Sequence, residues 1–140
     1  MTDTLPFIRK FLENTKLDFE IMDCESDFAD THNFCKRYGI NFEDAANTIV
    51  VKSKTGDLKY AACVLLATTK LDTNKTIRKK LNTHKVSFAS VEESEKLTNM
   101  QIGGVTPIEL PKNLPLWVDS RVMQRHIIVL GGGNRTSKIK

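Results

Sequence analysis

The sequence has no long apolar run and few of the residues that form disulfide bonds or bind metals. No stretch of about 18 apolar residues occurs, so we expect no membrane span. Three cysteines without a CxxC pair favour reduced thiols in a cytoplasmic protein. The start, MTDTLPFIRKFLENTK, is acidic early and lacks an apolar core, so we do not interpret it as a signal peptide.

Several motifs of cofactor and hydrolase chemistry are also missing. The nucleophile pattern GxSxG and the zinc pattern HExxH do not occur. His32, His84 and His126 lie far apart, and His32 with Cys35 falls short of the four ligands of a structural zinc site. LGGGNRTSK lacks the second glycine of a P-loop and the third glycine of a dinucleotide fingerprint. We therefore expect neither a metal nor a cofactor.

The composition suits one small domain, and its charge is unevenly placed. With 140 residues, 40% apolar and 27% charged, the chain is long enough for its own core, so we assign residues 1–140 to a single domain. The net charge of +4 arises entirely within residues 99–140. A second basic stretch covers residues 70–85, whereas residues 18–30 hold six acids and no base. This asymmetry favours a polyanionic partner, although an unevenly charged solvated surface has the same composition.

Hydrophobic periodicity predicts short helices interleaved with short strands. Helices are expected over residues 4–15 with Thr4 as cap, 28–38 ending at Gly39, 72–82 capped by Asp72, and from Ser90 to about Leu97. Strands are expected over residues 17–23, 47–53, 58–69, 85–90, 114–119, 126–130 and 137–140, with a hairpin turn at 54–57. The order predicts an α+β fold with a mixed, mostly antiparallel β-sheet or pseudo-barrel flanked by short helices.

Two glycine-rich segments are candidates for ligand contact. In IGGVTPIELP, Gly103 and Gly104 permit close approach to the backbone, while the prolines stiffen the loop, so its N–H groups can be pre-aimed at an oxyanion. A structural turn is the alternative. The segment 131–133 ends an apolar strand and precedes Arg135 and Lys138, which fits either an anion-binding nest or a tight turn between strands.

Two further side chains, a lysine and a cysteine, are candidates for a chemical role. Lys52 ends the apolar run 49–51 and shares a strand face with Thr48 and Val50. It either needs an anionic partner or reaches water at the strand end. A thiol nucleophile such as Cys24 is not excluded by the sequence, but cysteines are most often buried small apolar residues.

In order, these segments resemble the YbaK/EbsC family of aminoacyl-tRNA deacylases, free-standing relatives of the editing domain of bacterial prolyl-tRNA synthetases. The resemblance is carried by ANTIVVK, LTNMQIGGVTPIELPKNLPLWVDSRVM and IIVLGGGNR, and it runs from about residue 5 to the C-terminus. It implies a compact α+β fold. It also implies hydrolysis of the ester between a wrong amino acid and the 3′-terminal adenosine of tRNA, without an obligatory metal or covalent nucleophile.

The resemblance also implies roles for matched residues. Lys52 falls on a strand lysine that orients the tRNA 3′ end, and Gly103 and Gly104 fall on the loop whose backbone contacts the aminoacyl carbonyl. These three are the expected catalytic residues. The expected substrate-binding residues are Gly131, Gly132, Gly133, His126 and Arg135. Asp119 matches an acid that is expected to be structural.

The resulting prediction is a trans-acting aminoacyl-tRNA deacylase that edits mischarged tRNA of the tRNA(Pro) type. The expected partner is the acceptor end of an aminoacyl-tRNA, whose phosphates would meet residues 70–85 and 121–140, and a synthetase is a second candidate partner. Departures at Asn99, Glu109 and Lys138 keep open a catalytically silent module that binds tRNA or an aminoacyl ligand. The chain stops at Lys140, where relatives usually continue, and a shorter tail is expected to weaken the sheet edge. A thiol hydrolase using Cys24 is the third alternative.

Overall fold

The computed structural model describes residues 3–140. It contains short helices and two β-sheets of short strands. In chain order the elements are α1 (Pro6–Asn14), β1 (Ile21–Asp23), η1 (Ser26–Phe28), α2 (Thr31–Tyr38), η2 (Phe42–Asp44), β2 (Ala46–Ser53), β3 (Tyr60–Leu66), η3 (Thr73–Ile77), α3 (Arg78–Lys80), β4 (Val86–Phe88), α4 (Val91–Thr98), β5 (Leu116–Val118), η4 (Val122–Gln124), β6 (Leu130–Gly131) and β7 (Ser137–Ile139). Among these residues no helix combines the length and the apolar character needed to cross a bilayer.

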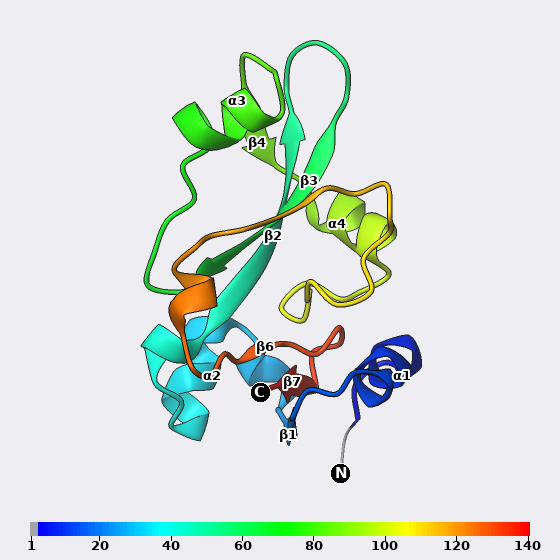
Figure 1. Ribbon diagram of the computed structural model, residues 1–140, viewed down its shortest axis with the longest axis vertical. Helices are drawn as coiled ribbons and strands as arrows, with labels where there is room; N and C mark the ends of the chain where they lie inside the picture. The colour runs from blue at the N-terminus through cyan, green and yellow to red at the C-terminus, as the bar shows by residue number, and fades with distance from the viewer. Residues whose placement is uncertain (1–2) are drawn as a thin grey trace.

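The larger sheet runs along the long axis of the molecule and has the strand order β4–β2–β3–β5 (Figure 1). Antiparallel pairing of β2 with β3 confirms the predicted hairpin. Pairing of β3 with β5 is parallel, which makes this sheet mixed. The hairpin turn therefore lies at one end of the molecule, and the first residues of β2 lie toward the other end.

The smaller sheet, β1–β7–β6, is antiparallel and lies at the end of the molecule where β2 begins (Figure 1). A single parallel bridge between Ala45 and Val129 joins the two sheets. The predicted α+β class with a mixed sheet is confirmed, and in the described part of the chain the strands do not close into a barrel.

Apolar clusters hold these elements in place. The first cluster fixes α2 beneath the smaller sheet, the second fixes α1 against the glycine loop, and the third fixes α3 on the hairpin. Their buried members are Cys24, Ala29, Phe34, Cys35, Ala45 and Val129 in the first, Ile8, Leu12, Met100, Val105 and Ile139 in the second, and Val51, Ala61, Cys63, Ile77 and Leu81 in the third.

Several local predictions hold because each rests on a specific hydrogen bond or backbone angle. Ser90 and Glu93 form both bonds of a capping box at the start of α4. Asp72 accepts the Lys75 N–H at 3.1 Å, and Gly39 ends α2 with φ of +70°.

Other local predictions were wrong in extent. The expected strand over 17–23 pairs only at Ile21–Asp23, and the strand over 126–130 pairs mainly at its last residue. The reason is that the smaller sheet offers partners over only three residues. Thr4 does not cap α1; its hydroxyl instead donates to the Gly132 carbonyl, which ties the N-terminal segment to the second glycine turn.

Candidate active site

A cavity of about 410 Å³ lies where α2, the start of β2, the loop after α4 and the β6–β7 sheet meet. The bridge between Ala45 and Val129 joins two of these elements, the start of β2 and the start of β6, which are far apart in sequence. The lining residues are Asp30, Thr31, His32, Phe34, Phe42, Ala45, Ala46, Asn47, Thr48, Ile49, Ile102, Gly103, Val105, Val129, Leu130, Gly131 and Lys138.

The two predicted glycine segments pack against each other backbone to backbone beside this cavity. A Cβ on Gly104 would lie 2.1 Å from the carbonyl oxygen of Asn134, and one on Gly131 would lie 2.4 Å from the carbonyl oxygen of Gly104. The Gly133 N–H donates to the Gly104 carbonyl at 2.6 Å. Glycine is therefore required at 104 and 131 by contact between the loops.

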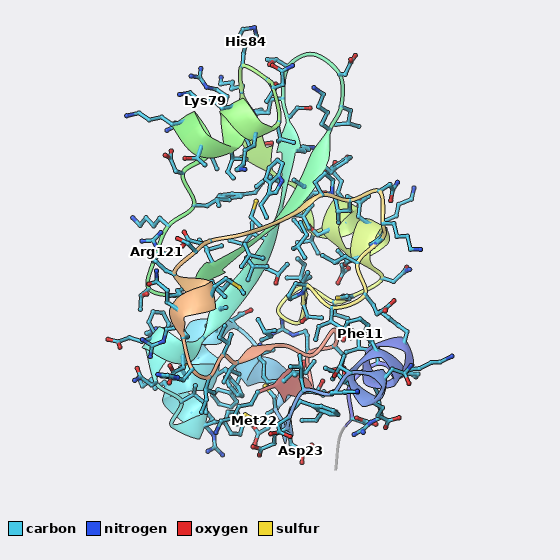
Figure 2. All side chains as sticks on the ribbon, viewed as in Figure 1. Phe11, Met22, Asp23, Lys79, His84 and Arg121 are labelled. Atoms are coloured by element: carbon cyan, nitrogen blue, oxygen red, sulfur yellow. The ribbon has the colours of Figure 1, made fainter. Side chains whose placement is uncertain are left out.

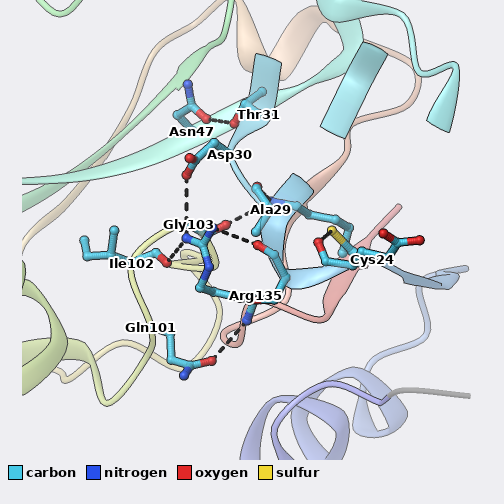
Figure 3. Close-up of polar contacts among 12 residues, drawn as sticks. Cys24, Ala29, Asp30, Thr31, Asn47, Gln101, Ile102, Gly103 and Arg135 are labelled. Carbon is cyan, nitrogen blue, oxygen red and sulfur yellow. Dashed lines mark hydrogen bonds and ion pairs between the residues drawn. The ribbon is translucent and has the colours of Figure 1, made fainter. Parts of the chain in front are cut away.

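Gly103 lines the cavity and is held by Arg135 from behind (Figure 3). Arg135 Nη1 donates to the Ile102 carbonyl at 2.8 Å, and Nη2 donates to the Ser26 carbonyl at 2.8 Å. Because the C=O and N–H of a trans peptide point in opposite directions, the Gly103 N–H points away from Arg135. Within the described chain this N–H donates to no acceptor, whereas the Gly104 N–H is engaged with the Gln101 carbonyl at 2.9 Å.

Lys138 is the buried cation of the described chain, and it lines the cavity. The residue is 5% exposed, and its ammonium donates to the Ala29 carbonyl at 2.6 Å and to the Gly103 carbonyl at 2.9 Å. The Nζ atom also lies 5.4 Å from the centre of the Phe34 ring. An ammonium has three N–H donors, so one remains, and residues 3–140 provide no carboxylate partner. Burial lowers the pKa of this ammonium.

Other lining residues add polar side chains to the cavity. Asp30 stands at the mouth with 64% of its side chain exposed and only a long 3.6 Å ion pair to Arg135. The Thr31 hydroxyl donates to the Asn47 side-chain oxygen (Figure 3). Deeper, Thr48 has a buried hydroxyl oxygen with no hydrogen-bond partner among the described residues. The ring of His32 meets Phe42 edge to face, with 5.9 Å between centroids.

Lys52, a predicted catalytic residue, does not line this cavity. The last residue of β2 that lines the cavity is Ile49, and Lys52 lies three residues, or roughly 10 Å, farther along the strand. Its ammonium lies 2.7 Å from Glu93 Oε1, and the Tyr60 hydroxyl donates to the second oxygen of Glu93. Lys52 thus has an anionic partner, one of the two alternatives that the sequence left open, and this partner is Glu93 of the same chain.

The remaining predicted substrate-binding residues divide between the cavity and its support. Gly131 lines the cavity, and Arg135 supports it from behind. Gly132 and Gly133 form the turn that packs against the first loop, so this segment is a tight turn whose Gly133 N–H is already bonded. His126 is exposed and is not part of the lining.

Neither a thiol nor a metal centre is built into the site. All three cysteines are free and buried, and the described lining contains none of them. Burial raises the pKa of the Cys24 thiol, whose Sγ donates to the Glu25 carbonyl. Among the described residues, no three His, Cys, Asp or Glu side chains gather as a metal site would require.

Two departures from the resemblance are accommodated by the backbone. Asn99 ends α4 with φ of +58°, the left-handed conformation that asparagine tolerates better than most residues. Glu109 also has a positive φ of 57°. Gly103, in the loop between them, lines the cavity.

Comparison with known proteins places this arrangement in a family. The model of the aminoacyl-tRNA editing domain matches residues 25–140. The chain belongs to the aminoacyl-tRNA editing domain family. The match includes every residue that lines the cavity.

Solved structures share the fold of this editing domain. The hypothetical protein APE2540 has 21% identity and a TM-score of 0.81, covering 95% of this chain and 86% of its own. A proposed trans-editing enzyme for prolyl-tRNA synthetase has 18% identity and a TM-score of 0.76, covering 96% and 85%. A scaffold protein used for epitope grafting has 16% identity and the same TM-score and coverage.

Within the editing domain, Asp30 was not among the predicted site residues, and Lys138 was named only as a base after the second glycine segment. Asp30 precedes α2 and gives only a helix-start signal. Lys138 stands in the short SKI strand, where alternation places it opposite Ser137 and Ile139 but cannot say what it faces. Pairing of β7 with β1 and β6, over more than 100 residues of chain in the first case, turns Lys138 toward α2 and the glycine loop.

Proposed function

We propose that this editing domain is a free-standing deacylase that hydrolyses the ester of a mischarged aminoacyl-tRNA in trans. The observation that supports this proposal is the buried Lys138 ammonium. It has one unused N–H beside a cavity, and it contacts the same residue, Gly103, that holds an unused backbone N–H. A buried charge without an anionic partner is costly, so such a cation is suited to an oxygen-rich ligand.

The two donors would stabilise the oxyanion of ester hydrolysis. Water adds to the carbonyl carbon, and the carbonyl oxygen takes the negative charge. The bond from carbon to the ribose oxygen then breaks, and that oxygen takes a proton, which gives a free amino acid and an intact tRNA. One oriented donor of this kind is worth about 3 kcal/mol. The neighbouring ribose hydroxyl relays the proton from water, so the protein need not supply a base.

The cavity would also select the amino acid. Asp30 at the mouth is placed to bind the α-ammonium of the aminoacyl group, so a substrate with a blocked amino group would be disfavoured. Apolar walls from Phe34, Phe42 and Ile49 limit the side chain that can enter. Because one methylene contributes only about 1–3 kcal/mol to discrimination, exclusion of larger amino acids would be steric. A tRNA of the tRNA(Pro) type is the first substrate to assay, and such a substrate implies a cytoplasmic protein.

Lys52 would have a supporting part in this scheme at most. Its charge is balanced by Glu93 in the first turn of α4, so it would fix the sheet to that helix rather than orient the tRNA end. Gly104 would act by holding the two loops together, and Arg135 by orienting the Gly103 peptide.

The decisive experiment is a deacylation panel of mischarged tRNAs with wild type, Lys138→Met and Lys36→Met. We expect wild type to release at least one amino acid, and Lys138→Met to reduce kcat/KM about 100-fold. Lys36 is an exposed lysine on α2 outside the lining, so its variant should match wild type. A thermal melt verifies that Lys138→Met is folded.

Two outcomes would contradict the proposal in different ways. If wild type leaves every ester intact yet retains tRNA on a filter, the chain is a silent binding module. If folded Lys138→Met turns over like wild type, the ammonium has no part in the reaction.

A further inference from the structure

Residues 70–85 leave β3 near the cavity end and run to the opposite end of the molecule, where η3 and α3 lie (Figure 1). Residues 70–85 contribute five exposed lysines, and within residues 3–140 none of them has a carboxylate partner. They are Lys70, Lys75, Lys79, Lys80 and Lys85. The single acid of this segment, Asp72, is occupied by the Lys75 backbone N–H and the Thr76 hydroxyl. Lys79 and His84 mark this end in Figure 2, and Met22 and Asp23 mark the other.

The second basic segment, 121–140, has its charges used inside the protein. Arg121 lies 2.7 Å from Asp119, and Arg125 lies 2.6 Å from Asp44. As described above, Arg135 and Lys138 are engaged at the cavity. Within the described chain, Lys140 is an exposed cation of this segment without a carboxylate partner, whereas residues 70–85 hold five such lysines.

Residues 70–85 are also mounted rigidly at a fixed distance from the cavity. Ile77 and Leu81 are buried against Val51 and Ala61 of the hairpin. The eight residues of β2 run from the cavity toward this end, which corresponds to roughly 25 Å. A polyanion anchored in the cavity would meet these lysines without any rearrangement of the fold.

A hollow lies beside residues 70–85. About 360 Å³ in volume, it lies between the segment and β5, and Lys70, Lys80 and Arg121 are among its lining residues. The Lys80 ammonium stands 5.3 Å from the centre of the Trp117 ring, which restricts the side chain to the wall of the hollow.

We infer that residues 70–85 bind the phosphate backbone of the RNA stem whose aminoacylated 3′ end occupies the cavity. This inference rests on the proposed function for its partner. It assigns affinity for the RNA body to one end of the molecule and ester chemistry to the other. Contacts of this kind carry no base specificity and weaken steeply with salt, because each neutralised phosphate releases counterions.

The test compares two triple charge reversals with the same change in net charge. Lys70→Glu/Lys75→Glu/Lys79→Glu alters the segment, and Lys10→Glu/Lys16→Glu/Lys36→Glu alters exposed lysines near the cavity end. Uncharged tRNA is titrated by fluorescence anisotropy at several salt concentrations. We expect the first variant to bind at least 10-fold more weakly, with the slope of log K against log salt reduced by about 2 to 3. The second variant should stay within about threefold of wild type.

A second measurement separates this inference from the proposed function. Deacylation is followed with aminoacyl-tRNA and with a short aminoacyl-adenosine ester that lacks the stem. The segment variant should lose activity on the tRNA and keep it on the short ester. The inference is overturned if both variants lose tRNA binding equally, if the segment variant binds like wild type, or if both substrates suffer alike. Should wild type cleave neither substrate, the proposed function fails, and the binding titration still decides the inference.

Discussion

Two lysines, one at each end of the molecule, have different kinds of partner. At the hairpin end, Lys52 is 30% exposed and lies 2.7 Å from a carboxylate. At the cavity end, Lys138 is 5% exposed, and its ammonium donates to two carbonyl oxygens. A cation paired with a carboxylate has little charge left for a ligand, whereas one held by carbonyl dipoles retains it. The type of partner, rather than burial or strand position, therefore distinguishes a supporting lysine from a candidate site lysine.

The glycines show the same contrast between the ends. Gly104 is packed against the backbone of the other loop, so a Cβ there meets atoms that cannot rotate away. Gly56, in the hairpin turn, has open space around it and needs glycine only because φ is +71°. At the cavity end glycine creates a contact, and at the hairpin end it permits a turn.

The largest effect on stability is expected from replacing a packed glycine at the cavity end. Gly104→Ala places a methyl group against the Asn134 carbonyl, so the loops must separate. We expect a loss of about 3 kcal/mol in the free energy of unfolding, the upper range for overpacking. Gly56→Ala should cost about 1 kcal/mol, the usual strain of an alanine with left-handed backbone angles. Urea unfolding measures both values, and equal losses would show that the loop contact is not a rigid one.

A smaller effect is expected from Lys52→Met. Because this lysine is paired away from the cavity, its loss should change kcat/KM by less than about threefold, and a loss comparable to that of Lys138→Met would restore the role inferred from the resemblance. Stability should fall only modestly, since partly exposed ion pairs contribute about 0–1 kcal/mol. Deacylation kinetics and thermal melts at pH 7 measure the two effects.

The stability effect of Lys52→Met should depend on pH with a defined sign. The hydrogen bond from Lys52, then that from Tyr60, lowers the pKa of Glu93 from 4.5 to about 2. A lowered carboxyl pKa stabilises the fold above the unfolded value, and this stabilisation is lost as the pH falls toward the folded value. The difference in melting temperature between wild type and variant should therefore be full at pH 6–7 and shrink between about pH 4.5 and 2. A difference that stays constant over this range would exclude Glu93 as the cause.

Local chemistry explains why part of the fold and site was predictable. The capping box at Ser90, the stop at Gly39 and the hairpin depend on residues close in sequence, and each was found. Of the two predicted glycines, Gly103 lines the cavity and Gly104 packs against the second glycine segment. Lys138 was named beside the second glycine segment, but its place at the cavity depends on pairing of β7 with β1, and no local pattern contains that register.

The smallest expected effect concerns two buried threonines, of which one lines the cavity. Thr48 and Thr106 both have buried hydroxyl oxygens without a partner in the described chain, but only Thr48 lines the cavity. Replacing either by valine removes an unsatisfied polar atom and should leave the free energy of unfolding unchanged or raise it by about 1 kcal/mol. If substrate supplies the missing partner, Thr48→Val should raise KM about fivefold with little change in kcat, as expected for loss of one neutral hydrogen bond. Thr106→Val should leave KM unchanged, so equal KM values in the two variants would show that the Thr48 hydroxyl does not meet the substrate.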